Sequence, residues 1–327
     1  MNGMVRLGSG SRRPLDVGTL ERDLSGLWKE ARGEEARVMR ACHATLVVAA
    51  GDDDARTRDF LDELTALHPS RILVVRESGS RPPKQVEAWV SASCSRRPGD
   101  VLICGETVHL EAGPESDRIL ASVIRSLRVG DLPAAAVVRE RSPLVPGWVG
   151  EVESELDLVV GDSEALVPPA AARLWSRCGM DTRPAGHDLA WSRLLPWRRA
   201  VASLFDAEEG RSRLDALAGI EVEGKGEGDP RALLLAAWLA GGLGEVLVGR
   251  PRPGSDLSVG LRFGEESTVF RPGPSGSGIV RDPGGERVSP GQAISDARAV
   301  VEEIRRPAPD PAFRKAARRA AAWGVGS

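Results

Sequence analysis

Residues 45–75 read TLVVAAGDDDARTRDFLDELTALHPSRILVV and carry the clearest pattern in the chain. Short apolar runs at 45–49 and 72–75 have the length of buried strands. The segment between them is predicted to be an amphipathic helix, because apolar residues recur there at helical spacing: Phe60, Leu61, Leu64 and Leu67. A strand, a helix and a second strand in this order predict a βαβ unit.

Elements on both sides extend this unit into a layered α/β domain. Leucines at helical spacing after Thr19 predict an N-terminal helix. Residues 88–93 and 101–110 are predicted to pair as a hairpin around the turn at Pro98-Gly99. The other elements predicted here are a helix over 117–127 and strands over 134–138 and 156–160. Apolar strands of this kind need helices on their faces, so the predicted fold class is α/β.

The domain organisation is predicted from length and from changes in composition. With 327 residues, the chain has the length of about two domains. We predict a flexible tail over 1–18, which is rich in Gly, Ser and Arg, and an N-terminal α/β domain over 19–165. Helices and short strands after Pro168-Pro169 predict a smaller α+β C-terminal domain over 166–304, and the arginine-rich segment 305–327 predicts a solvated basic tail.

Composition argues against several classes of function. The net charge is −3, with 44 Lys+Arg against 47 Asp+Glu, which argues against nucleic-acid binding. The longest apolar runs, 44–50 and 233–240, fall short of the roughly 20 residues that a membrane span requires. No apolar segment follows the arginines of 1–14, so no secretory signal is predicted and a cytoplasmic location is expected.

One string resembles a hydrolase motif, Gly161-Asp162-Ser163 after a predicted strand. Its serine would need a base, and in that class of hydrolase the base lies in an Asp-x-x-His string. The only downstream histidine, His187, has Pro184 three residues before it. We therefore predict that Asp162 and Ser163 satisfy backbone N–H groups at a strand-to-helix junction. A hydrolase or sugar-phosphate enzyme that uses Ser163 is the alternative.

Metal and phosphate sites are not indicated either. The glycine-rich stretch 273–278 lacks the strand and helix that a phosphate cradle requires, so a loop is predicted. The three acids 52–54 are predicted to cap a helix, and the histidines lack the spacing of metal ligands. We therefore expect no catalytic residue, no metal and no cofactor.

The four cysteines include no C-x-x-C pair, which argues against a structural zinc site, and reduced thiols are expected. Cys94 and Cys104 lie at equal distances from Gly99, so in the simplest register of the hairpin they face each other. A non-hydrogen-bonded pair would bring them close enough for a disulfide and a redox pair. The alternative is that each cysteine serves as a small buried apolar residue.

The segment 188–206 combines large aromatic residues with arginines. Such a combination is typical of interface anchors. The candidate partner-binding residues are Trp191, Arg193, Trp197, Arg198 and Arg199. The alternative is that the apolar residues of this segment seal a domain core and leave the arginines in solvent.

The order of several strings resembles the glucose-6-phosphate dehydrogenase assembly protein family, OpcA. The shorter strings are LW at 27–28, HPSR at 68–71, ICGETVHL at 103–110, DLPA at 131–134 and VVGDS at 159–163. The most specific are DLAWSRLLPWRR at 188–199 and LLLAAWLAGGLG at 233–244. The resemblance covers about Leu20 to Gly244.

The resemblance implies a non-enzymatic protein that binds glucose-6-phosphate dehydrogenase and promotes its active oligomer. Such an effector works by binding the active state of its partner more tightly than the inactive state. Other members of the family are associated with cysteine-based redox control. The resemblance does not assign those cysteines to the four of this chain. A redox-sensing binding module that uses Cys94 and Cys104, the facing pair of the predicted hairpin, is a further hypothesis.

Overall fold

The computed structural model describes residues 4–9, 11–34, 38–51, 55–98, 101–139, 146–205, 214–244, 247–273, 277–289, 294–306 and 310–324. Contacts between Cα atoms divide the chain into two compact units. Unit 1 comprises 1–161, 182–185 and 296–307, and unit 2 comprises 162–181, 186–295 and 308–327. The chain first passes from unit 1 to unit 2 after Gly161, whereas the sequence predicted a domain boundary after residue 165. None of the helices in these residues has the length and apolar character to cross a membrane.

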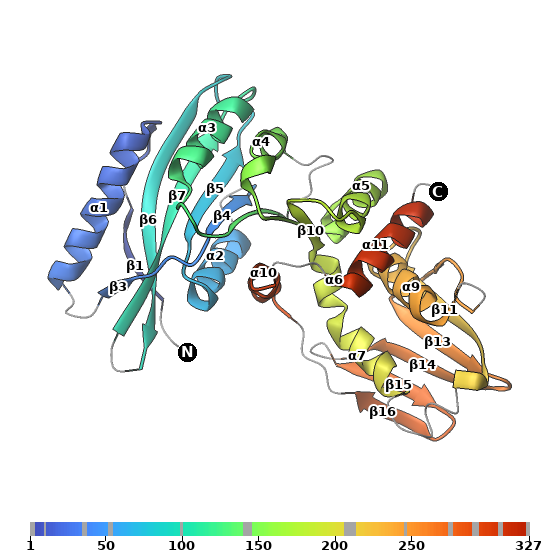
Figure 1. The fold of residues 1–327 in the computed structure, drawn as a ribbon. Helices are drawn as coiled ribbons and strands as arrows, with labels where there is room; N and C mark the ends of the chain where they lie inside the picture. Colours follow the sequence, from blue (N-terminus) through green and yellow to red (C-terminus); the bar gives the residue numbers. More distant parts are fainter. Residues whose placement is uncertain are drawn as a thin grey trace. The chain divides into compact units, whose positions relative to one another are not determined.

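Unit 1 is built on a mixed sheet whose strands follow the order β1-β6-β7-β5-β4-β8-β9 (Figure 1). The predicted βαβ unit is confirmed, because β4 (Thr45–Ala49) and β5 (Arg71–Glu77) pair in parallel and α2 (Ala55–Leu67) connects them. The strands that extend this unit are β8 (Ala134–Val138), parallel to β4, and β9 (Leu158–Gly161), parallel to β8. The acids 52–54, predicted to cap α2, lie outside the described residues.

Helices cover both faces of this sheet, as the α/β class requires. The connections β4-α2-β5 and β7-α3-β8 run in opposite directions across the strand order, so right-handed crossovers place α2 and α3 on opposite faces. One core cluster joins the sheet to three helices, α1 (Val17–Glu34), α3 (Asp117–Leu127) and α4 (Gly147–Glu151). A short 3-10 helix, Glu153–Glu155, connects α4 to β9.

Helix α10 (Asp296–Ile304) packs against α2 and belongs to unit 1. Arg139, directly after β8, forms an ion pair with Asp296 at 3.3 Å, and its guanidinium lies 4.2 Å from the centre of the Phe60 ring of α2. The sequence placed this helix in a C-terminal domain over 166–304. The prediction followed the order of residues in the sequence. In the structure, the contacts of α10 with α2 make it part of unit 1.

The hairpin is confirmed and is longer than predicted, with β6 (Val86–Arg97) paired to β7 (Val101–Ala112). Gly99 and Asp100 of its predicted turn lie outside the described residues. Strands β1 (Met4–Ser9) and β2 (Arg13–Pro14) pair with β6, and β3 (Val38–Arg40) pairs with β7. The expectation of a flexible tail over 1–18 is therefore wrong for these two N-terminal strands, because β6 offers them a free edge.

Unit 2 holds a second sheet, of six strands in the described part of the chain, in the order β12-β11-β13-β14-β15-β16. Their bounds are β11 (Leu217–Lys225), β12 (Arg252–Gly254), β13 (Ser258–Phe263), β14 (Glu266–Pro272), β15 (Gly278–Asp282) and β16 (Gly285–Ser289). Residues 274–276 of the predicted glycine-rich loop lie outside the described residues, and the loop joins β14 to β15. Burial alternates along β11, β13 and β14, so one face of the sheet is covered.

Helix α9 (Pro230–Leu243) packs on β11, and α5 (Pro168–Gly179) and α11 (Pro311–Gly324) contribute to the same core cluster. Helix α11 packs on both α5 and α9 (Figure 1). The expectation of a solvated basic tail over 305–327 is wrong for this helix. Its apolar residues recur on one face and are buried there, namely Phe313, Ala316, Ala317, Ala320 and Ala321. The positive charge of the segment lies on the other face of the same helix, so composition alone suggested solvent.

Candidate functional site

The Trp/Arg segment runs from the end of β10 (Ala185–Asp188) through α6 (Leu189–Arg193) and α7 (Leu195–Ser203). Strand β10 contains the change of unit, because Ala185 counts with unit 1 and Gly186 with unit 2. The Asp188 side chain caps α6 by accepting a hydrogen bond from Ala190 N at 3.0 Å. Pro196 lies in the first turn of α7, where its missing N–H costs nothing.

Trp191 is a core residue of unit 2 rather than a surface anchor. Its exposed fraction is 4%, and its ring centre lies 5.3 Å from that of Phe313 of α11. The Arg198 guanidinium lies over the same indole at 3.6 Å from the ring centre. These two residues of the predicted partner-binding set therefore contact each other. The sequence could not show this, because Phe313 lies far away in the chain.

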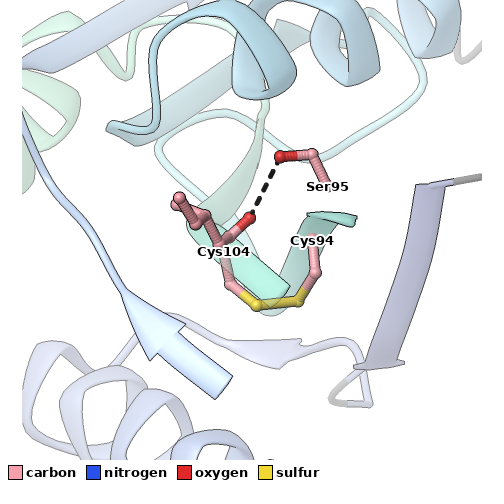
Figure 2. Close-up of a disulfide and its surroundings, with 4 residues drawn as sticks. Cys94, Ser95 and Cys104 are labelled. Carbon is pink, nitrogen blue, oxygen red and sulfur yellow. Dashed lines mark hydrogen bonds between the residues drawn. A yellow bond between two sulfur atoms is a disulfide. The ribbon is translucent and has the colours of Figure 1, made fainter. Parts of the chain in front are cut away.

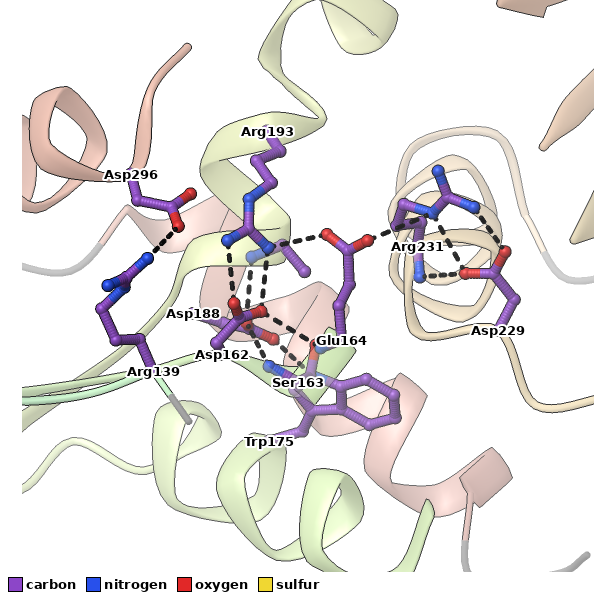
Figure 3. Close-up of polar contacts among 11 residues, drawn as sticks. Arg139, Asp162, Ser163, Glu164, Trp175, Asp188, Arg193, Asp229, Arg231 and Asp296 are labelled. Atoms are coloured by element: carbon purple, nitrogen blue, oxygen red, sulfur yellow. Dashed lines mark hydrogen bonds and ion pairs between the residues drawn. The ribbon is translucent and has the colours of Figure 1, made fainter. Parts of the chain in front are cut away.

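Arg193 pairs with acids of its own unit (Figure 3). Its two terminal nitrogens lie 2.8 Å from Asp162 Oδ2 and 2.8 Å from Glu164 Oε1. Glu164 continues this network to Arg231 at 3.5 Å, and Arg231 also pairs with Asp229 at 3.0 Å. The charge of Arg193 is thus neutralised locally, because acids of the short 3-10 helix Ser163–Ala165 and the residue before it approach its guanidinium.

Two members of the predicted set lie nearer to solvent. Arg199 is exposed, and Trp197 is half-buried at the edge of the unit 2 core. Whether these two side chains contact a partner stays a prediction.

A pocket of about 270 Å³ lies beside this network in unit 2. Its lining residues carry both signs of charge, namely Lys225 and Arg231 against Glu164, Glu227 and Asp229. Burial raises the pKa of Asp229, but hydrogen bonds from Arg231 and from Lys225 N outweigh it and leave the pKa below its ordinary value. Among the described residues there is no group of three or more His, Cys, Asp or Glu side chains that could hold a metal ion.

The Gly-Asp-Ser string forms the predicted strand-to-helix junction. The prediction that both side chains satisfy backbone N–H groups is confirmed for Asp162 and is wrong for Ser163, whose own N–H is the donor. Asp162 accepts a hydrogen bond from Glu164 N at 3.2 Å, and Ser163 N donates to Asp188 Oδ1 at 3.1 Å. Ser163 has an exposed fraction of 0%. His187, the base that the enzyme alternative would use, is also buried and stacks on Phe313. A nucleophile must be reached by its substrate, and Ser163 is closed to solvent.

Asp188 is the buried acid at the centre of this junction. Its carboxylate accepts hydrogen bonds from Trp175 Nε1 at 2.7 Å, Ala190 N at 3.0 Å and Ser163 N at 3.1 Å. Burial disfavours the charged form and outweighs these hydrogen bonds, so the pKa of Asp188 is raised to about 6.

Cys94 and Cys104 form a disulfide across β6 and β7 (Figure 2). They are directly opposite in the register, with Cα atoms 3.9 Å apart. Cys104 O accepts a hydrogen bond from Ala41 N, so it points away from β6, and the two cysteines form a non-hydrogen-bonded pair, the condition for a disulfide. The expectation of reduced thiols is wrong for this pair, whereas Cys42 and Cys178 are free. A redox role for the pair stays a prediction.

A buried ion pair beside this disulfide was not predicted from the sequence. Glu106, two residues after Cys104 on β7, is buried and accepts a hydrogen bond from Arg71 Nε of β5. Trp28 Nε1 of α1 also donates to Glu106, at 3.2 Å, and Arg40 approaches it at 2.9 Å. Arg71 directly precedes the apolar run 72–75 that predicted a buried strand, and this is the signal that could have indicated a buried partner.

Comparison with known proteins relates both units to one family. Residues 61–177 match the family described as the N-terminal domain of the glucose-6-phosphate dehydrogenase subunit. Residues 184–317 match the family described as the C-terminal domain of the same subunit. The chain is also 26% identical over 189 residues to a protein of Synechocystis sp. named "Putative OxPP cycle protein OpcA". That match covers 57% of this chain and 40% of the relative, so the chain spans less than half of the relative's length.

Proposed function

The chain belongs to the OpcA family of glucose-6-phosphate dehydrogenase subunits, and from this membership we propose that it is a non-catalytic assembly factor and allosteric activator of that dehydrogenase. The proposal rests on one observation, the match of both units, over 61–177 and 184–317, to domains of a dehydrogenase subunit. The activity would belong to the oxidative pentose phosphate pathway. We expect it to take place in the cytoplasm, as composition suggested.

An activator of this kind needs no chemistry of its own. It shifts its partner toward the active oligomer only by as much as it binds that state more tightly than the inactive one, and a few kcal/mol is enough. The burial of Ser163 supports the non-catalytic part of the proposal, because the one candidate nucleophile of the sequence is closed to solvent.

A steady-state assay of the cognate dehydrogenase tests the proposal. Glucose 6-phosphate is varied at fixed NADP⁺, with and without an excess of this chain, and the oligomeric state is measured by light scattering during gel filtration. We expect a lower half-saturation concentration, a complex that elutes with both proteins, and a larger dehydrogenase oligomer. An unchanged kinetic curve together with separate elution of the two proteins would contradict the proposal.

The matched control is the chain with Ser163→Ala. Because Ser163 is buried and its backbone N–H makes the contact to Asp188, this variant is expected to activate the dehydrogenase as the wild type does. Loss of an intrinsic hydrolytic turnover in this variant would favour the enzyme alternative instead.

A further inference from the structure

The second sheet has one covered face and one outward face. Along β13, Val259, Leu261 and Phe263 are buried in the core of unit 2, while Arg262 between them is exposed. The side chains of the outward face therefore belong to the alternate residues of each strand. From this face we infer a docking surface for the dehydrogenase, at a patch of the enzyme where carboxylates surround a small apolar centre. This inference rests on the proposed function and adds the surface that carries it.

The register places an apolar strip diagonally across the outward face, with Arg281 directly opposite Val269. Val269 of β14 lies opposite Gly260 of β13, and on the next two strands Ile279 lies opposite Val288. Val269 and Ile279 are half-buried, and Val288 has an exposed fraction of 66%. Three β-branched side chains on neighbouring strands thus share one surface, which is the composition of an interface centre rather than of a solvated sheet face.

Two arginines on the middle strands flank this strip. Arg262 lies opposite Ser267, and Arg271 lies opposite Ile279. Both side chains are exposed, and within the described residues neither guanidinium has an ion pair or a hydrogen bond. They differ in this from the arginines of the edge hairpin, because Arg281 pairs with Glu286 at 2.9 Å and Arg287 with Asp282 at 2.7 Å.

The acids at the other side of this face are already engaged. Glu221 of β11 pairs with Arg252 at 3.5 Å, and Glu223 accepts a hydrogen bond from Ser258 at 3.1 Å. On the outward face of the middle strands, the charge left without a partner is therefore positive, because the exposed Glu266 of β14 lies opposite the buried Phe263 and so belongs to the other face. Arginine binds carboxylates in a planar, two-point geometry, so a partner with acids around an apolar centre complements this face.

The outward face is a better candidate for docking than the Trp/Arg segment, because several side chains of that segment already have partners within unit 2. Trp191, Arg193 and Arg198 of that segment use their rings and charges within unit 2, whereas Arg262 and Arg271 do not.

Charge reversal of the two arginines tests the inference. The full-length chain with R262E and R271E is titrated against the cognate dehydrogenase, with binding measured by interferometry and activation measured by the steady-state assay. The matched control carries R56E and R118E, two exposed arginines of unit 1, and changes the net charge equally. Circular dichroism and thermal unfolding check that both variants fold. We expect the dissociation constant of the first variant to exceed that of the control by at least about fivefold.

A smaller difference between the two variants, with a wild-type chain that binds, would overturn the inference and leave the proposed function intact. The inference would also be overturned if a double variant with W197A and R199E lost binding while the double variant with R262E and R271E retained it. A wild-type chain that does not bind the dehydrogenase would overturn the proposed function itself. The remaining alternative is that a second copy of this chain binds the outward face, and light scattering of the chain alone tests it. A homodimer that dissociates in the R262E and R271E variant would assign this face to self-association and overturn docking of the enzyme.

Discussion

Two buried carboxylates, Glu106 in unit 1 and Asp188 in unit 2, are stabilised in different ways. Glu106 receives the cationic side chains of Arg71 and Arg40 together with one indole N–H. Asp188 receives hydrogen bonds from neutral groups of Ser163, Trp175 and Ala190, and the nearby Arg193 pairs with Asp162 instead. A buried carboxylate that is paired with a cation loses its stabilisation when the cation is removed. A buried carboxylate that accepts hydrogen bonds from neutral groups alone destabilises the fold when it ionises, so its contribution to stability depends on pH.

The largest expected effect comes from removing the cation of unit 1. Arg71→Met leaves Glu106 buried with one strong donor fewer, and we expect the free energy of unfolding of unit 1 to fall by about 3–5 kcal/mol. Urea-dependent hydrogen exchange of peptides from β7 measures this within the unit. The double variant Arg71→Met with Glu106→Leu should regain most of the loss, because the charges that lose their partners, Arg40 and Glu21, are both partly exposed. A cost of less than about 1 kcal/mol for the single variant would contradict this account.

The disulfide beside Glu106 is expected to contribute less. Cys94→Ser with Cys104→Ser should lower the stability of unit 1 by about 2.5 kcal/mol, because the closed loop is short. The same measurement on β7 peptides gives this value, and Cys178→Ser is the control. Thiol titration of the unfolded, unreduced wild type should detect only Cys42 and Cys178. Detection of all four thiols would contradict the disulfide.

The redox prediction for this pair has its own readout. If Cys94 and Cys104 act as a switch, a thiol reductant should change activation of the dehydrogenase by the wild type and not by the double serine variant. Equal responses of the two proteins would contradict a redox role and leave the pair as a structural link between β6 and β7.

The third expected effect is a change in the stability of unit 2 with pH, which comes from Asp188. The pKa of Asp188 in the folded chain, about 6, lies above its ordinary value of 3.8, so ionisation costs stability. Stability from this group is complete below about pH 4 and is lost as pH rises through 6. Between pH 5 and pH 7 we expect unit 2 to lose about 1 kcal/mol relative to Asp188→Asn, measured by hydrogen exchange of α6 peptides. Parallel pH profiles for wild type and variant would contradict the raised pKa.

The sequence predicted best what is local or periodic. The βαβ unit, the hairpin register and the opposition of Cys94 and Cys104 follow from alternation and from one turn, so they could be predicted. The packing of Trp191 on Phe313 and the pairing of Arg139 with Asp296 join residues far apart in the chain, and no local pattern contains them. For the same reason the local pattern that makes Trp191 and Arg193 candidate interface residues does not contain their contacts to Phe313 and Asp162.

The smallest expected effect tests whether Arg193 protects Asp188 from its acidic neighbour. The negative charge of Asp162 raises the pKa of Asp188, and Arg193 neutralises Asp162 at 2.8 Å. Arg193→Gln should therefore shift the midpoint of the pH profile of α6 stability upward by about 0.3–0.5 pH unit, while the loss of a partly exposed pair costs only about 0.5–1 kcal/mol. Arg199→Gln, an exposed arginine of the same segment, should leave the midpoint in place. An unchanged midpoint in Arg193→Gln would mean that burial alone raises the pKa of Asp188. The difference between Asp188 and Glu106 would then come from desolvation and not from the pairing of Arg193 with Asp162.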